Sequence, residues 1–271
     1  FDMDGTLTPA RKPITEKTVI LLRDLSAYAR VGIVSGSPWE YIDQQLQTLW
    51  SSQSGPSPES LVIMPCNGTH VMEWDTQNQA YTTTYNVNFK SHLLSLDKGK
   101  ERKLYNEYVT HILELQLQFM QEYGFEDLTG NFVSYRGSML NWSPVGRDAG
   151  DTERAAFIKL DKEMGVRNKL REFLRVRLDA SGLHETDLNL GGSTSIDIHP
   201  TGWDKTHALT HCGDAKVWFV GDKCMPGGND WSLYEALRQQ GRSFSTRDPE
   251  QTEQIVREQI MPVIREENKN R

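Results

Sequence analysis

Apolar residues divide the two ends of the chain into alternating segments of two kinds. In one kind they recur at steps of three and four, as at Val19, Leu22 and Leu25, which predicts an amphipathic helix. Thr15 precedes this helix and can cap it. In the other kind they form a short unbroken run, as in residues 30–35, which is typical of a buried parallel strand. The alternation predicts a parallel sheet with helices packed on its faces.

The same criteria predict further elements in both end regions. Helices are expected over 39–50, from 204, after 229 and from 249, and strands over 61–66, 215–221 and 242–245. A loop rich in Ser, Pro and Gly is expected over 51–60. The chain begins at Phe1, where a strand is expected to lead into the following residues, so we expect further residues upstream.

The pattern changes near Phe89, where the middle of the chain begins. One long amphipathic helix is predicted by six residues at helical steps: Leu104, Tyr108, Ile112, Leu115, Phe119 and Tyr123. Further helices are expected over 152–164 and 168–181, and strands over 132–136, 139–143 and 193–199. The last strand alternates, with apolar Ile196 and Ile198 on one face and polar residues on the other. These elements predict an open antiparallel sheet backed by helices.

The two patterns together predict an α/β fold, in which a Rossmann-like parallel-sheet core carries an inserted α+β cap of antiparallel strands and helices. The core is expected to comprise residues 1–88 and 201–271. The cap is expected to comprise residues 89–200, and the long helix at 104–123 forms either its core or a subunit interface.

The composition, with 37% hydrophobic and 25% charged residues, is that of an ordinary soluble globular protein. A net charge of −7 argues against a general nucleic-acid or anionic-membrane binder, because such proteins present a basic face. The three cysteines, Cys66, Cys212 and Cys224, suggest neither a disulfide framework nor a zinc motif, so we expect reduced thiols in a cytoplasmic protein. No apolar run approaches the roughly 20 residues of a membrane span, and no signal peptide is evident.

The strongest chemical signal is the run Phe-Asp-Met-Asp-Gly-Thr-Leu-Thr at residues 1–8. Asp2 and Asp4 are separated by one residue at an expected strand end, so they project to the same side. Two crowded carboxylates are unfavourable unless a cation neutralises them or one of them is protonated. The pair suits a hard divalent cation, and it suits catalysis by one nucleophilic and one acid/base carboxylate.

A second signal follows the strand expected at 215–221, because Asp222 comes directly after it and Asp230 follows two glycines and an asparagine. Sites in open α/β sheets lie beyond the carboxyl ends of the strands, so both aspartates are expected at the same edge as Asp2. Lys205 supplies a positive charge for a phosphoryl group. Each motif alone also occurs in turns or calcium loops, but their conjunction favours a catalytic site.

These residues resemble the haloacid-dehalogenase superfamily. The resemblance implies that Asp2 carries phosphate and that Asp4 is the general acid/base. It implies that Lys205 stabilises the phosphoryl group together with a serine after the second strand, Ser35 in preference to Ser37.

The same resemblance implies a magnesium ion on Asp2, on the main-chain carbonyl of Asp4 and on Asp222, with Asp230 in support. The residues after Asp230 lack the aspartate that can hold a second cation, so a second cation site is left open.

A closer resemblance, to the eukaryotic-type phosphomannomutases, extends over nearly the whole chain. It is carried by LTPAR at 7–11, RGSMLN at 136–141, SPVGR at 143–147, GWDK at 202–205 and the residues from GDK to PGGND at 221–230. The resemblance implies an enzyme of hexose phosphates that needs a hexose 1,6-bisphosphate, and a homodimer formed through the cap. Cys66 and Cys224 depart from the family, which often has Glu and Thr at these positions.

The resemblance also implies a set of substrate-binding residues: Arg11, Arg136, Asn141, Arg147, Arg154, Ser195 and Asp197. Arginine forks suit phosphate geometry, and Ser195 and Asp197 share a strand face from which they can bind sugar hydroxyls. Arg154 lies on a charged helix face, where a solvated surface charge is the alternative. His199 shares the face of Asp197 and is assigned no role.

The expected reaction interconverts mannose 6-phosphate and mannose 1-phosphate through an aspartyl-phosphate on Asp2. A sugar phosphatase on the same core is the nearer alternative, and a non-catalytic binding protein is the more distant one. The sequence leaves the choice between mannose and glucose phosphates open. Neither nucleic acid nor membrane is expected as a partner.

Overall fold

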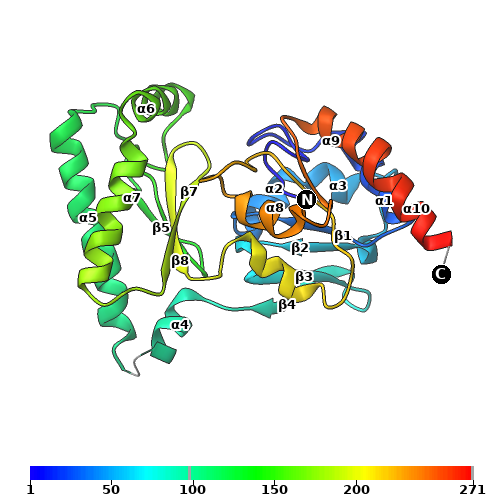
Figure 1. Ribbon diagram of the computed structural model, residues 1–271, viewed down its shortest axis with the longest axis horizontal. Coiled ribbons are helices and arrows are strands. Elements are labelled where there is room, and N and C mark those ends of the chain that lie inside the picture. The colour runs from blue at the N-terminus through cyan, green and yellow to red at the C-terminus, as the bar shows by residue number, and fades with distance from the viewer. Residues whose placement is uncertain (97–98, 270–271) are drawn as a thin grey trace. The chain divides into compact units, whose positions relative to one another are not determined.

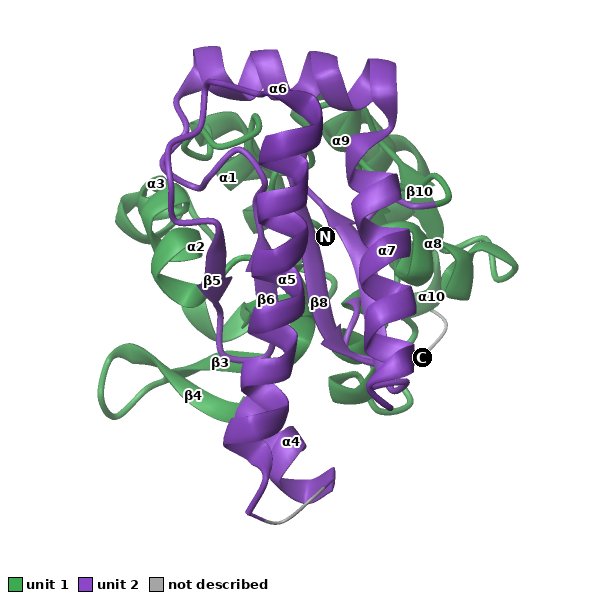
Figure 2. Ribbon diagram, turned by 90° about the vertical axis from the view of Figure 1, so that its left-hand side faces the viewer, with its two compact units in different colours: residues 1–86, 205–226, 230–271 green, residues 87–204, 227–229 purple. Residues whose placement is uncertain are grey.

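The computed structural model describes residues 1–96 and 99–269. It divides into two compact units, which Figure 2 shows in different colours. Unit 1 comprises residues 1–86, 205–226 and 230–271, and unit 2 comprises residues 87–204 and 227–229. The segment predicted as the cap, 89–200, lies within unit 2.

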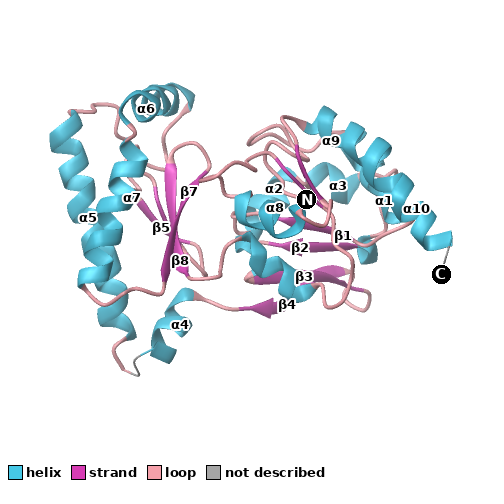
Figure 3. Ribbon diagram, in the orientation of Figure 1, coloured by secondary structure: helices cyan, strands magenta, loops and turns pink. Residues whose placement is uncertain are grey.

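The sheet of unit 1 is built from parallel pairs of strands. Strand β1 (Val31–Val34) pairs in parallel with β2 (Leu61–Met64), and β9 (Phe219–Gly221) pairs in parallel with β10 (Ser243–Ser245). Two antiparallel strands, β3 (His70–Asp75) and β4 (Ala80–Asn86), extend the first pair beyond β2 (Figure 3). All strands of this unit except this hairpin follow the predicted parallel arrangement.

The first two residues of the chain connect the two pairs. Phe1 forms two main-chain hydrogen bonds with β1. Its amino group donates to Gly32 O at 2.8 Å, and its carbonyl oxygen accepts from Val34 N at 2.8 Å. The N–H of Asp2 donates to Val220 O of β9 at 3.0 Å. Phe1 and Asp2 therefore lie between β1 and β9, at the centre of a continuous arrangement of strands.

Helices of unit 1 pack on this sheet (Figure 1). They are α1 (Glu16–Ser26), α2 (Trp39–Gln45), α3 (Gln47–Ser51), α8 (Trp231–Arg238), α9 (Pro249–Ile255) and α10 (Met261–Lys269), with a π-helical turn at Val256–Ile260 between the last two. Thr15 caps α1 as predicted, since its side chain accepts from Thr18 N. Val19, Leu22 and Leu25 of α1 are buried in the core of this unit.

Two predicted helices of unit 1 differ from the structure. The helix expected over 39–50 is divided at Leu46, because the carbonyl of Gln45 accepts from Ile14 N at 2.9 Å instead of continuing the helix. The helix expected from 204 is a 3₁₀-helix over Lys205–His211, in a segment containing two Thr and two His, which are weak helix formers. Short 3₁₀-helices also occur at Pro58–Ser60 and Cys66–Gly68.

Unit 2 contains an antiparallel sheet in the order β5-β6-β8-β7. Its strands are β5 (Val133–Tyr135), β6 (Leu140–Trp142), β7 (Thr186–Gly191) and β8 (Ser195–Pro200), and its helices are α4 (Phe89–Leu96), α5 (Glu101–Tyr123), α6 (Asp151–Met164) and α7 (Val166–Ala180). Helices α5 and α7 lie over one face of the sheet in Figures 1 and 2. Most of the predicted apolar positions of α5, together with Ile196 and Ile198, are buried in one hydrophobic cluster, so this stripe is core.

The sequence pattern missed β3, β4 and β7. Strand β7 has only two apolar residues between polar ones, Leu188 and Leu190, and β4 is largely exposed, so neither produces a long apolar run. No helix within the two described ranges is both long and apolar enough to cross a membrane. The three cysteines form no disulfide.

Candidate active site

The candidate catalytic residues of unit 1 follow the carboxyl ends of its central strands. Ser35 follows β1, Asp222 follows β9, and Asp2 lies between these strands. Because the strands run in parallel, their ends meet at one edge of the sheet, where open α/β folds place their ligands.

Lys205 joins two of the aspartates. Its Nζ donates to Asp2 Oδ1 and, at 2.5 Å, to Asp230 Oδ1. The side chains are buried, with relative exposures of 0% for Lys205, 0% for Asp230 and 4% for Asp2. A buried charge requires a partner, and this ammonium group has two.

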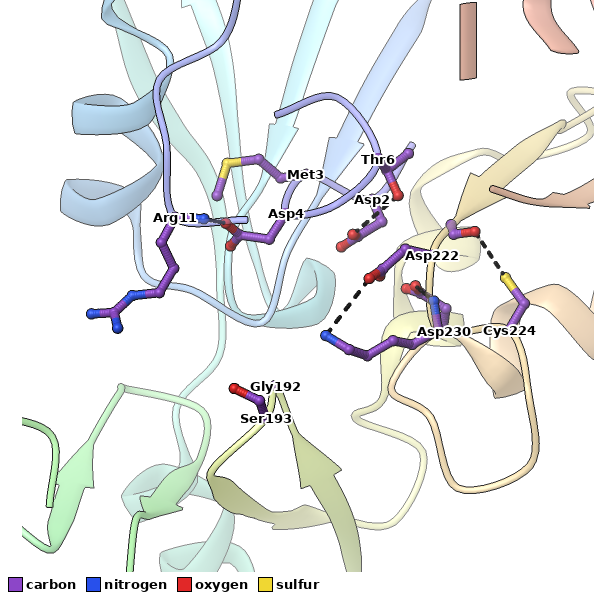
Figure 4. Close-up of polar contacts among 12 residues, drawn as sticks. Asp2, Met3, Asp4, Thr6, Arg11, Gly192, Ser193, Asp222, Cys224 and Asp230 are labelled. Carbon is purple, nitrogen blue, oxygen red and sulfur yellow. Dashed lines mark hydrogen bonds and ion pairs between the residues drawn. The ribbon is translucent and has the colours of Figure 1, made fainter. Parts of the chain in front are cut away.

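Three aspartates form a compact acidic cluster. A carboxylate oxygen from each of Asp2, Asp222 and Asp230 lies within 4.8 Å of the others. Figure 4 shows these carboxylates gathered on one side of the turn that follows Asp2. Both oxygens of Asp230 are engaged by protein donors, since Oδ2 accepts from Lys223 N at 2.9 Å. Asp222 is only partly buried, and Lys223 Nζ approaches it no closer than 3.7 Å, so Asp222 is the more available ligand.

The charges of this cluster do not balance. Burial, and next the nearby Asp230, raise the pKa of Asp2 to about 7, although Lys205 acts in the opposite direction. Burial likewise raises the pKa of Asp222. Burial opposes ionisation of Asp230, but Lys205 outweighs it and holds the pKa of Asp230 below its usual value. Three carboxylates and one buried ammonium leave two negative charges when all are ionised, which a divalent oxygen-seeking cation would neutralise.

Gly5 allows Asp222 to approach the turn. A Cβ at this position would lie 2.6 Å from Asp222 Oδ2, and the φ of +85° is a conformation that suits glycine. The next residue, Thr6, donates its hydroxyl to Asp2 Oδ2 at 3.3 Å. Glycine is required at this position for two reasons, the backbone turn and the space for the Asp222 carboxylate.

The carboxylate of Asp4 lies outside the acidic cluster. Its Oδ1 accepts from the main-chain N–H of Arg11 at 2.7 Å, and Figure 4 shows it directed towards that residue. Asp4 and Asp2 therefore have different surroundings, one outside the cluster of acidic groups and one inside it. The side chain of Arg11 is exposed and donates from Nε to Tyr41 Oη at 3.2 Å.

Ser35 and Ser37 belong to one turn after β1. Ser35 is buried and its Oγ accepts from Ser37 N at 3.1 Å. The hydroxyl proton of Ser35 remains able to donate while its oxygen accepts. The strand end thus carries a buried hydroxyl at the position where the resemblance implies one that contacts the phosphoryl group.

The predicted binding residues of unit 2 include a connected polar network. Arg147 donates from NH1 to Asn141 Oδ1 at 2.7 Å, and Asn141 Nδ2 donates to Asp197 Oδ1. Asn141 and Asp197 are cross-strand partners in β6 and β8. A Cβ on Gly191 would lie 2.5 Å from Asp197 Oδ2, so this glycine leaves room for the carboxylate.

The other residues predicted to bind substrate in unit 2 have separate positions. Ser195 is buried and its Oγ donates to Gly191 O at 2.8 Å. Arg154 donates from NH2 to Ser193 Oγ at 3.3 Å. Arg136 lies in the turn between β5 and β6, where its N–H bonds Met139 O at 2.9 Å.

Sequence reasoning missed two polar contacts near these residues. Asn189 Nδ2 lies 3.0 Å from His199 Nε2, across β7 and β8. Gln45 is buried beside Asp4, in line with the apolar positions Ile42 and Leu49. The sequence did contain a signal for Gln45, because a polar residue at a buried position of a predicted helix needs a hydrogen-bond partner.

The fold is that of the haloacid-dehalogenase superfamily: a parallel-sheet core with an inserted α+β unit, in which Ser35 and Asp222 follow the central strands and Asp2 lies between them. Among solved structures, an IMP-bound, N-terminally truncated IMP-nucleotidase of Plasmodium falciparum shares this fold, with a TM-score of 0.62 at 12% identity. The similarity covers 94% of this chain and 66% of that chain, so this chain spans slightly less than two thirds of that structure.

The family follows from the sequence comparisons. The family model "Eukaryotic phosphomannomutase" matches residues 71–262. A phosphomannomutase of Dendrobium officinale is 33% identical over 92% of this chain and 88% of its own length. The phosphomannomutase of Saccharomyces cerevisiae is 32% identical over 95% of this chain and 92% of its own length. The chain belongs to the eukaryotic phosphomannomutase family and is an enzyme of this type.

Proposed function

We propose that the protein interconverts mannose 6-phosphate and mannose 1-phosphate, through a phosphate carried on Asp2 and with a hexose 1,6-bisphosphate as activator. The observation that carries this proposal is the buried contact between Lys205 and Asp2 within the cluster of three aspartates. Burial alone would keep Asp2 protonated, so a nucleophilic carboxylate here needs the positive charge that surrounds it.

The first step transfers a phosphoryl group to the protein. A carboxylate oxygen of Asp2 forms a bond to phosphorus while the bond from phosphorus to the sugar oxygen breaks. Asp4 gives its proton to that sugar oxygen, which leaves as a hydroxyl group. Lys205 and the hydroxyl of Ser35 offset the charge on the phosphoryl oxygens, where stabilisation of this reaction is largest.

The second step reverses the first at the other end of the sugar. Asp4 takes the proton of the accepting hydroxyl, whose oxygen forms a bond to phosphorus as the bond to Asp2 breaks. Because both sugar phosphates can accept the group, the net result is an isomerisation with the bisphosphate regenerated. The same cycle can serve glucose phosphates.

Magnesium fits the acidic cluster, which offers hard oxygen ligands and excess negative charge. Asp2, Asp222 and the main-chain carbonyl of Asp4 would hold the ion, and Asp230 would support it through Lys205 and the loop at Lys223. When bound, the ion would neutralise charge on the carboxylates and on the phosphoryl oxygens.

The predicted binding residues of unit 2 would hold the phosphate that does not react. Arg136, Arg147 and Arg154 would supply guanidinium groups, and Ser195, Asp197 and Asn141 would supply hydrogen bonds for sugar hydroxyls. Arg11 would do the same from unit 1. We further propose a cytoplasmic homodimer formed through unit 2, in keeping with the resemblance that carries these residues.

A phosphorus NMR time course tests the proposal. Mannose 1-phosphate and glucose 1-phosphate are each incubated with the protein, with and without hexose 1,6-bisphosphate and Mg²⁺. The expected result is conversion to the 6-phosphate that requires the bisphosphate and the cation. Release of inorganic phosphate at a comparable rate would instead identify a sugar phosphatase, and an unchanged spectrum under all conditions would reject both.

A further inference from the structure

The carboxylate of Asp4 is anchored through one of its two oxygens. The main-chain N–H of Arg11 donates to Oδ1 at 2.7 Å. Arg11 has a φ of 59°, which is unfavourable for a residue with a side chain, so the chain accepts local strain where it presents this N–H. Within residues 1–96 and 99–269, no hydrogen bond is formed to Asp4 Oδ2.

A second donor to the same oxygen comes from Gln45, the last residue of α2. Its side chain is only 5% exposed. One of its terminal atoms lies 3.1 Å from Asp4 Oδ1 and 3.2 Å from the main-chain oxygen of Lys12. Both neighbours are acceptors, so this atom is the amide nitrogen, and its two hydrogens serve these two bonds.

The surroundings fix the Gln45 amide in place. Thr8 Oγ1 packs 3.3 Å from the same Gln45 atom and donates its own proton to Met3 O, so both hydrogens of the amide remain for Asp4 and Lys12. At the other end of the residue, the Gln45 carbonyl accepts from Ile14 N at 2.9 Å. The amide is therefore held by its main chain and by its side chain, and it cannot turn away from Asp4 without breaking buried bonds.

We propose that Gln45 is a positioning residue for Asp4, and the proposal rests on the acid/base role given to Asp4 above. Gln45 and the Arg11 N–H hold Oδ1, so Oδ2 is the oxygen that gives its proton to the departing sugar oxygen and later takes one from the accepting hydroxyl. An amide suits this task, because it does not ionise and so does not compete for the proton. It orients the carboxyl group without entering the reaction.

The test separates proton transfer from phosphoryl transfer by changing the leaving group. A sugar oxygen needs a proton as it leaves, whereas 4-nitrophenolate leaves without one. Formation of the phosphorylated protein is measured by rapid quench from a hexose 1,6-bisphosphate, and as the burst of nitrophenolate from 4-nitrophenyl phosphate. The variant is Gln45→Met, which keeps the length of the side chain but removes the donor, and the control is Gln44→Met at the exposed neighbouring position of α2.

Gln45→Met is expected to slow phosphorylation from the bisphosphate by about tenfold to a hundredfold, the range for losing a hydrogen bond to a charged group, with KM nearly unchanged. The nitrophenolate burst should change by less than about threefold, because the proton is not needed there. Gln44→Met should be phosphorylated as fast as the unsubstituted protein by both the bisphosphate and 4-nitrophenyl phosphate.

An equal loss of phosphorylation rate with the bisphosphate and with 4-nitrophenyl phosphate would show that Gln45 only supports the fold. No loss of rate with either compound would show that Asp4 does not need Gln45. Both results would overturn the proposal. If Gln45→Met does not fold, Gln45→Asn replaces it, because its amide is one methylene too short to reach Oδ1, and the same selective loss is expected. Absence of phosphorylation in the unsubstituted protein would reject the proposed function, which is a distinguishable outcome.

Discussion

The ammonium group of Lys205 donates a hydrogen bond to the carboxylate of Asp2, 203 positions away in the sequence, and both side chains are buried. The same ammonium group binds Asp230, so one cation is shared by two buried carboxyl groups. Burial alone would lower the pKa of Lys205, but the two aspartates reverse this effect and raise it. Lys205 is therefore a permanent positive charge at the centre of the site.

Lys205→Met should abolish phosphorylation of Asp2 and also weaken the fold. The substitution leaves two buried carboxylates without their cation, which costs about 3–5 kcal/mol in the free energy of unfolding. Urea denaturation followed by circular dichroism measures the loss. Lys223→Met is the matched control, because its side chain is partly exposed and 3.7 Å from Asp222, and a loss below about 1 kcal/mol is expected there. Equal losses in the two variants would contradict the assigned pairing.

Magnesium should stabilise the protein in the absence of any sugar phosphate. Binding to the folded state alone adds about 2.7 kcal/mol at a concentration one hundred times the dissociation constant, so the midpoint of thermal unfolding should rise with MgCl₂. Sodium chloride at matched ionic strength is the control. Asp222→Asn should remove most of the rise, since Asp222 is the available ligand of the cluster. A rise that persists unchanged in this variant would place the ion elsewhere.

Gly5→Ala should be far more harmful than an equivalent change at another glycine of positive φ. The new Cβ would lie 2.6 Å from Asp222 Oδ2, whereas at Gly241, with φ +66°, nothing lies within 4 Å. Gly241→Ala should cost about 1 kcal/mol, from backbone conformation alone. Gly5→Ala should cost about 1–3 kcal/mol more and reduce Mg²⁺ affinity, because Asp222 must move. Similar stability of the two variants would refute the close approach of Gly5 and Asp222.

The folded protein should lose stability at alkaline pH because the Cys224 thiol is buried. Burial, with a further contribution from Asp230, raises the pKa of Cys224 from 9.0 to about 12. Above pH 9 the thiol ionises in the unfolded chain but stays protonated in the folded protein, so folding becomes less favourable by up to about 1.4 kcal/mol per pH unit. Other groups titrate here too, so the measurement is the difference in unfolding free energy between the unsubstituted protein and Cys224→Thr from pH 8 to 11. A pH-independent difference would contradict the assigned shift.

Arg147→Lys should weaken substrate binding while leaving the fold intact. Lysine keeps the charge but loses the planar fork that binds Asn141 and that suits a phosphate, so kcat/KM should fall by about tenfold to a hundredfold. KM should account for most of the change, because the proposed contact is to the phosphate that does not react. Arg102→Lys, at an exposed position of α5, is the control and should leave both constants unchanged. A fall in kcat alone would place Arg147 nearer the reacting group.

Local pattern was enough for most elements, as α1 and α5 illustrate. The cap at Thr15 and the apolar steps along α5 act within a few residues of one another, so the sequence contains their cause. Strands β4 and β7 were missed because each is an edge strand with few buried apolar residues, so pairing with the adjacent strand stabilises it without an apolar pattern in the sequence. The division of the helix at Leu46 depends on a hydrogen bond to Gln45 from Ile14, 31 residues away.

For the site, the sequence by itself determined which side chains are available: two aspartates around one turn, a second acidic motif after an apolar strand, and a lysine between them. Only the tertiary structure decided how they are shared, with Lys205 bound to Asp2 and Asp230, and Asp4 turned away towards Arg11 and Gln45. The physical reason is that a hydrogen bond acts over about 3 Å, whereas these partners are separated by up to 203 positions, and only the folded sheet brings them within that distance.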